Sequence, residues 1–141
     1  MGKKKPGKKV PEVELYSYGI YGKWNRESRD LPELKKITTS IPVVPDVEFG
    51  YVLKIKGGKG YALAYRIDHP PIRDGNGDWM PPFTGEIIIP SNEWEFFLGD
   101  TVWEPYEEKA GRWVLITHIQ GKEVARKSFD LHLSDNNLTQ R

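Results

Sequence analysis

The stretch from residue 111 to residue 131 constrains the fold of this 141-residue chain more than any other. It begins with a run of Trp, Val, Leu, Ile and Thr, residue types that suit a pleated surface. A second such run follows after glycine and charged residues, which predicts a β-hairpin that turns at Gly121-Lys122. Trp113 and Phe129 are the largest residues of the two strands, so we expect both in the core.

The pairing register of this hairpin decides which of its side chains are buried. A two-residue loop pairs Trp113 with Asp130, whereas a three-residue loop or a bulge pairs Trp113 with Leu131 and Leu115 with Phe129. Because side chains alternate along a strand, this one-residue shift exchanges the two faces. We prefer the second register, since it gathers the largest apolar groups on one side.

Short strand patterns fill the rest of the chain. Clean alternation at 49–55 and 61–67, on either side of a glycine-rich turn, predicts a second hairpin. Further strands are expected at residues 13–21, 37–41, 86–90 and 94–98, and a capped helical turn at residues 30–33. Together these patterns predict an all-β, antiparallel immunoglobulin-like sandwich of about seven to eight strands. The chain contains no Cys, so this sandwich has no disulfide.

The chain length predicts one domain, which we place at residues 13–133, with a short C-terminal tail at 134–141. Residues 1–12 contain Lys, Gly and Pro with almost nothing apolar, so we expect a disordered basic tail. Residues 1–9 of that tail hold five of the 21 basic residues, which leaves 16 basic against 20 acidic residues in residues 10–141. With a net charge near −4, the body is not expected to bind nucleic acid.

Several functional classes lack their sequence signals. No apolar run approaches the ~20 residues of a membrane helix, and no secretory signal follows the first residue, so we expect a soluble, cytoplasmic protein without membrane contact. The chain has no thiolate, no nucleophile elbow and no phosphate-binding loop before a helix. We therefore expect no cofactor and favour a non-catalytic protein.

The connection from residue 68 to residue 83 is unusually long and contains four prolines and two glycines. Loops of this length in compact domains are commonly functional. Within it, residues 74–78 space three oxygen-bearing side chains as a calcium loop does. The sixth position is Trp79 and the twelfth is Gly85, which do not fit such a loop. We favour a turn stabilised by its own Asp and Asn side chains, and predict no metal site.

The segment from residue 74 to residue 108 contains nine acidic residues and no Lys, Arg or His. Seven aromatic residues are interleaved with them. If acids of the loop and of the later corner cluster beside these aromatics, they form a surface for a protein or a cationic ligand. The predicted binding residues are Asp74, Asn76, Asp78, Trp79, Asp100, Trp103, Glu104, Glu107 and Glu108. The alternative is a carbohydrate- or metal-binding domain that uses Trp79, Trp94 or Trp103 as platforms with nearby acids.

His69 suggests a third, less favoured function. It follows Asp68 at the start of the long loop, and an Asp–His pair can orient an imidazole for hydrolysis. Adjacent residues of a strand point to opposite faces, however, so Asp68 is poorly placed for that role. We favour His69 as a polar residue that hydrogen-bonds the loop.

Several short motifs lie along the expected strands and loops: Tyr18-Gly19-Ile20-Tyr21, Ile41-Pro42, Phe49-Gly50, His69-Pro70, Met80-Pro81-Pro82-Phe83-Thr84-Gly85, Phe97-Leu98-Gly99-Asp100, Trp103, Gly111-x-Trp113 and Phe129. Together they resemble a known bacterial family, the domain of unknown function 3859 family. The resemblance covers nearly all of residues 13–131. It implies a single β-rich domain and carries no assigned activity.

Overall fold

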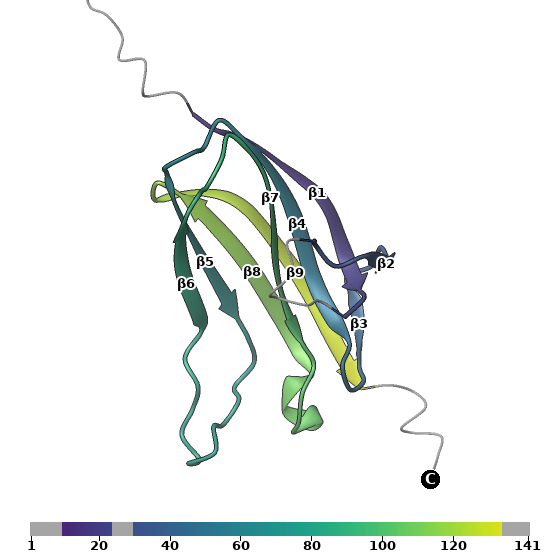
Figure 1. The fold of residues 1–141 in the computed structure, drawn as a ribbon. Coiled ribbons are helices and arrows are strands. Elements are labelled where there is room, and N and C mark those ends of the chain that lie inside the picture. Colours follow the sequence, from purple (N-terminus) through teal and green to yellow (C-terminus); the bar gives the residue numbers. More distant parts are fainter. Residues whose placement is uncertain (1–9, 24–29, 134–141) are drawn as a thin grey trace, which may run out of the picture.

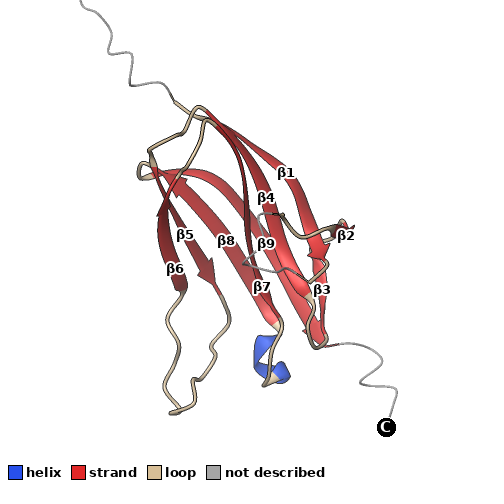
Figure 2. Ribbon diagram, viewed as in Figure 1, coloured by secondary structure: helices blue, strands red, loops and turns tan. Residues whose placement is uncertain are grey.

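The computed structural model describes residues 10–23 and 30–133, which form two β-sheets that face each other (Figures 1 and 2). The prediction of an all-β sandwich is confirmed. The elements are β1 (Glu12–Tyr21), β2 (Leu34–Lys36), β3 (Ser40–Val43), β4 (Glu48–Lys56), β5 (Ala62–Asp68), β6 (Phe83–Ile88), β7 (Glu93–Thr101), the 3-10 helix η2 (Tyr106–Lys109), β8 (Gly111–Ile119) and β9 (Lys122–Leu133). No helix in these residues is long and apolar enough to cross a membrane.

The strands divide between a four-stranded and a five-stranded sheet. The first sheet has the order β2-β1-β4-β7, and the second has the order β3-β9-β8-β5-β6. The pairings between these strands are antiparallel except that of β3 with β9, which is parallel. Strand β1 already begins at Glu12, inside the predicted tail. The predictions for residues 1–9 and 134–141 fall outside the described residues.

The β8–β9 hairpin exists, but its predicted register is wrong. Trp113 lies opposite Phe129, not opposite Leu131, and the turn is at Gln120-Gly121. Both turn residues have positive φ, 52° and 79°, as a tight two-residue hairpin turn requires. A bulge near Thr117 shifts the pairing by one residue. The observed and preferred registers differ by two residues, so the same side chains still face inward.

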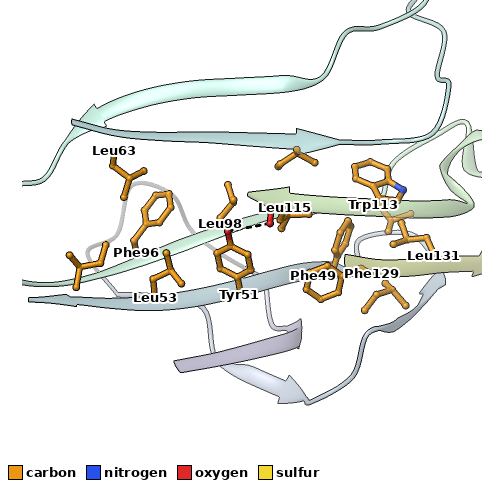
Figure 3. Packing of buried hydrophobic residues seen from close by; sticks show 14 of the residues in the cluster. Phe49, Tyr51, Leu53, Leu63, Phe96, Leu98, Trp113, Leu115, Phe129 and Leu131 are labelled. Atoms are coloured by element: carbon orange, nitrogen blue, oxygen red, sulfur yellow. Dashed lines mark hydrogen bonds between the residues drawn. The ribbon is translucent and has the colours of Figure 1, made fainter. Parts of the chain in front are cut away.

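The core between the sheets is centred on this hairpin (Figure 3). Trp113 and Phe129 are 1% and 0% exposed, which confirms the prediction that both are in the core. The Phe49 ring of β4 meets them edge-on, at centroid distances of 5.4 and 5.6 Å. One buried polar pair, the Tyr51 and Thr117 hydroxyls 2.7 Å apart, links β4 to β8. Burial raises the pKa of Tyr51, so this phenol stays neutral.

Three glycines lie in one row across the first sheet. Gly19 of β1, Gly50 of β4 and Gly99 of β7 are direct neighbours in the strand registers. A Cβ at Gly50 would collide with the carbonyl oxygen of Leu98, and one at Gly19 with that of Lys36. Glycine is therefore required because the adjacent backbone comes too close for any side chain.

The predicted hairpin of residues 49–55 and 61–67 is wrong, because β4 and β5 belong to opposite sheets. The glycine-rich connection crosses from one sheet to the other and bonds to the second crossover, between β6 and β7. Gly57 N–H donates to the Asn92 carbonyl and Gly60 N–H to the Ile89 carbonyl, both at 2.8 Å. The alternation predicted the strands and their inward faces, but not their partners.

Two predictions for residues 30–41 are also wrong. Residues 30–33 form no helical turn. The next strand, β2, instead pairs with β1 at the edge of the first sheet. The strand predicted at 37–41 begins only at Ser40 and continues through Pro42 to Val43. Ile37 lies before this strand and is 66% exposed. Proline is tolerated in β3 because an edge strand has one side on which no amide hydrogen is needed for a neighbouring strand.

Candidate functional site

The loop between β5 and β6, residues 69–82, projects from the end of the sandwich that also carries η2 (Figure 1). We call this loop the finger. Its two arms pair: Met80 N–H donates to the Ile72 carbonyl at 2.8 Å, and Arg73 and Trp79 form a β-bridge. The Ile72 side chain is 1% exposed and anchors the finger to the core. The finger is therefore a small ordered hairpin.

The tip of the finger is a tight turn that uses its own acidic side chain. Asp74 Oδ1 accepts hydrogen bonds from the amides of Asn76, at 2.8 Å, and Asp78, at 3.0 Å. The Gly77 amide donates to the Asp74 carbonyl at 3.0 Å. This turn accounts for the acidic spacing that resembles a calcium loop. The described residues include no group of three His, Asp or Glu side chains arranged to hold a metal ion.

His69 ties the two arms of the finger together at its base. Its Nδ1 lies 2.7 Å from the Pro70 carbonyl oxygen, and its Nε2 lies 2.8 Å from the Pro81 carbonyl oxygen. The ring also contacts Phe83 and Trp113. Asp68 pairs with Arg66 instead of orienting the imidazole. With both nitrogens directed at backbone carbonyls, this geometry gives no support to a hydrolytic role for His69.

Two cations that flank the acidic segment lie on the tryptophans that were predicted as platforms. The Arg73 guanidinium carbon is 3.8 Å from the centroid of the Trp79 ring, and Lys109 Nζ is 4.3 Å from that of Trp103. Lys109 is fully buried and donates to the Pro105 carbonyl at 3.1 Å. Burial lowers the pKa of Lys109, although nearby carboxylates act in the opposite direction.

Neither cation was predicted from the sequence, because both lie immediately outside the acidic segment. Arg73 precedes its first acid and Lys109 follows its last. Extending the segment by one residue in each direction would have revealed them. The interaction of a cation with an aromatic face, predicted for a partner, is thus already made within the chain.

The structure brings the finger close to residues 102–110, the segment between β7 and β8 that contains η2 and that we call the η2 corner. Glu108 Oε1 accepts the Arg73 amide at 3.2 Å and joins the two. The acids and amide left exposed at this end are Asp74, Asn76, Asp78, Glu104 and Glu107.

Two other predicted residues have different surroundings. Asp100 is half-buried at the end of β7, where its Oδ1 accepts the Thr101 amide at 2.9 Å. The half-buried Trp103 packs against Phe83 and Trp113 at ring distances of 6.1 and 6.4 Å. Trp79, by contrast, is 59% exposed. Among the tryptophans that the structure describes, Trp79 is therefore the one that presents its ring to solvent.

Solved structures similar to this chain show its fold. An immunoglobulin-like protein from Pseudomonas aeruginosa is 20% identical, with a TM-score of 0.68 over 86% of this chain and 97% of that chain. This similarity confirms the predicted immunoglobulin-like sandwich.

Two further structures are much less similar. A DNA-bound Pseudomonas fluorescens alkylpurine DNA glycosylase is 13% identical, with a TM-score of 0.39 over 67% of this chain and 28% of that chain. A CARDB domain from Pyrococcus furiosus, in complex with di-metal ions, is 14% identical, with a TM-score of 0.36 over 93% of this chain and 100% of that chain. Neither similarity is strong enough to support a DNA- or metal-binding function.

No curated protein matches the sequence. A family model, however, matches residues 9–131, which include every described strand from β1 to β8 and β9 as far as Leu131. That span agrees with the region over which the sequence motifs resemble the same family. The chain therefore belongs to the family described as Domain of unknown function (DUF3859).

Proposed function

We propose that this protein is a non-catalytic binding module whose contact surface is the finger tip together with the η2 corner. The observation that carries the proposal is Trp79, which is 59% exposed on an ordered hairpin. An exposed Trp on a fixed backbone is a suitable binding anchor, because little conformational freedom is lost when a partner covers it. The hydrogen bonds of Asp74 and His69 supply that fixed backbone.

The charge around Trp79 supports a cationic partner surface. Asp74, Asp78, Glu104 and Glu107 are exposed at this end of the sandwich. The nearest cation, Arg73, stacks on Trp79 and bonds to the Gly77 carbonyl at 2.7 Å. A partner with basic residues would complement the remaining acids and orient on approach, with an affinity that falls as salt screens the charges.

A carbohydrate partner is the second candidate. The observation that favours it is the exposed Trp79 ring close in sequence to the exposed Asn76 amide, since amides and aromatic faces together can bind polar ligands.

We also propose that this binding module is cytoplasmic. That location is supported only by the expectation drawn from the sequence.

The test compares wild-type protein with Trp79→Ala as baits in co-purification from the native host. It also includes titration with a basic peptide and with a neutral oligosaccharide, followed by amide chemical shifts. We expect a specific partner that Trp79→Ala loses. We also expect peptide-induced shifts at residues 73–79 that weaken in moderate salt and in the double variant Asp78→Asn, Glu107→Gln.

The matched control is Trp94→Phe, at a half-buried tryptophan of β7 away from the finger. It should retain every partner that the wild-type protein captures. Identical partners for wild type and Trp79→Ala, with no shifts in the finger, would contradict the proposed surface. Chemical-shift changes with the oligosaccharide but not with the peptide would indicate that the partner is a carbohydrate and not a cationic protein.

A further inference from the structure

The two sheets do not extend equally far on the side of β6 and β7. The Tyr65 and Phe96 rings, 6.3 Å apart, place β5 opposite β7. The Tyr51–Thr117 hydrogen bond places β4 opposite β8. Given the strand orders, β6 extends beyond the last strand of the first sheet, and within the described residues no strand lies opposite it.

A groove of about 600 Å³ occupies this position. Its walls are largely apolar and include Tyr65, Phe83 and Ile87 of the second sheet and Phe96 and Leu98 of β7. Asp100 and Trp103 also line it. Ile87 is 37% exposed and lines the groove. Ile88 is 62% exposed and, as the next residue of the strand, points to the opposite face.

Strand β7 offers backbone groups along the same groove. In the described part of the chain it pairs with β4 on one side only. An edge strand presents unpaired amide hydrogens and carbonyl oxygens to any further strand. A strand added to β7 would extend the first sheet and would lie opposite β6.

The charges of the first sheet indicate what such a strand should carry. On its outer face two rows alternate in sign across β1, β4 and β7: Glu12, Lys56, Glu93 and Glu14, Lys54, Glu95. Lys54 Nζ is 3.9 Å from Glu95 Oε2. Both rows end on a glutamate of β7, the last strand of this sheet in the described residues. Because opposite charges on neighbouring strands stabilise a sheet, the next strand should place cations beside these glutamates.

We propose that an extended basic segment of a partner protein binds here as an additional strand on β7. Its apolar side chains, at alternate positions, enter the groove and cover Tyr65, Phe83 and Ile87. Its Lys or Arg side chains, at the intervening positions, lie beside Glu93 and Glu95. Main-chain hydrogen bonds to β7 supply affinity, and the alternating side chains supply specificity.

Segments of this chain fit the groove less well. Strand β7 contains no basic residue, so a second copy that paired through β7 would bring no cation to Glu93 or Glu95. The lysine-rich residues 1–9 contain only Met1 and one proline besides lysine and glycine, and cannot fill an apolar groove. The groove therefore favours a different protein as its partner.

The experiment titrates the full chain with the capped peptide TVKVKVT and follows amide chemical shifts. We expect shifts along β7, residues 93–101, and protection of its amides from hydrogen exchange. Ile87→Glu should weaken the peptide affinity at least about ten-fold, because it places a charge in the apolar wall. The matched control Ile88→Glu, on the other face of the same strand, should leave the affinity within about two-fold.

Two control peptides separate strand addition from general charge attraction. TVEVEVT, with Glu for each Lys, and TVKPKVT, with Pro in place of the central Val, should both bind at least about ten-fold more weakly. Equal binding of either control, absence of shifts in β7, or dimerisation of the free protein through β7 would overturn the proposal. Trp79→Ala should not change the affinity for TVKVKVT, so the result is independent of the finger surface.

Discussion

The β8–β9 hairpin and the finger use similar residues for opposite purposes. Each is a hairpin with a tryptophan, yet Trp113 is 1% exposed and Trp79 is 59% exposed. Trp113 is surrounded by aromatic rings from both sheets, and its indole N–H donates to the Lys109 carbonyl at 2.8 Å. Trp79 has one intramolecular ring contact in the described structure, with Arg73.

The difference lies in what holds each hairpin in place. The core hairpin is stabilised by apolar burial, which contributes about 1.5–3 kcal/mol for each large side chain. The finger is ordered by hydrogen bonds within its own arms and by one buried residue, Ile72. A hydrogen bond contributes only about 0.5–1.5 kcal/mol net. The finger can therefore be fixed in shape while its largest side chain remains available for contact.

The largest expected effect is at the centre of the core. Trp113→Ala should lower the free energy of unfolding by about 3–5 kcal/mol, because it removes the ring that contacts Phe49 and leaves a cavity. Urea unfolding followed by circular dichroism measures the loss. Trp113→Phe, which keeps an aromatic ring there, should lose less. An alanine variant as stable as the wild type would contradict the conclusion that Trp113 stabilises the core.

Ile72→Ala tests whether the finger depends on its single buried anchor. The side chain is 1% exposed, so we expect a loss of about 2–4 kcal/mol by urea unfolding. Hydrogen exchange should also accelerate in residues 73–80 more than in β8. If exchange instead accelerated equally in both regions, Ile72 would belong to the common core and would have no special role in the finger.

Tyr51→Phe tests the buried polar pair of the core. Loss of the bond to Thr117 should cost about 1–2 kcal/mol, since the threonine hydroxyl stays buried. The pKa of Tyr51 is raised above its usual 10.0 by burial, so the unfolded chain ionises first. The contribution of the neutral phenol is complete below pH 10.0 and is lost as the pH rises above it. Tyr51→Phe should therefore flatten the alkaline part of the stability curve, whereas an unchanged curve would contradict this assignment.

Trp79→Ala should change the free energy of unfolding by less than about 0.5 kcal/mol, because the ring is already mostly in solvent. The thermal midpoint of the variant should match that of the wild type within error. A loss comparable to that of Trp113→Ala would mean that the ring stabilises the fold, and would leave the finger without its proposed contact residue.

The smallest effect is expected at the surface of the core hairpin. Glu123 accepts two hydrogen bonds from Arg126, at 3.0 and 2.8 Å, which lower the pKa of Glu123. The contribution of this pair is present above the usual pKa of 4.5 and is lost as the pH falls through the lowered value. Because both groups are exposed, Glu123→Gln should produce only a slight decrease in the thermal midpoint at pH 7, which disappears in acid. A decrease that persists in acid would show that the side chain acts through packing.

Sequence periodicity determined the class of the fold and most of the inward faces. The residues at 49, 51, 53 and 55 and those at 63 and 67 are all buried, as their alternation predicted. A period of two defines which side of a strand is apolar, and an inward face looks the same whichever sheet it belongs to. The all-β sandwich and the burial of Trp113 and Phe129 followed from this local information.

Strand partners were decided by the tertiary structure. The 57–60 turn looked like a hairpin turn, but its amides bond to the carbonyls of Asn92 and Ile89, from a distant crossover. The register of β8 and β9 depends on a bulge near Thr117 that the residue pattern did not predict. Such choices reflect contacts between segments far apart in the chain, which local propensity does not encode.

The candidate site divides in the same way. The sequence by itself determined that residues 74–78 form a turn and that acids and aromatics gather between residues 74 and 108, because side-chain chemistry and spacing are local properties. Only the tertiary structure decided that Trp103 is half-buried while Trp79 is exposed, and that Arg73 and Lys109 lie over these rings. The exposure of a side chain depends on what the rest of the chain places around it. Trp79 and Trp103 therefore differ in exposure only once the sheets have assembled.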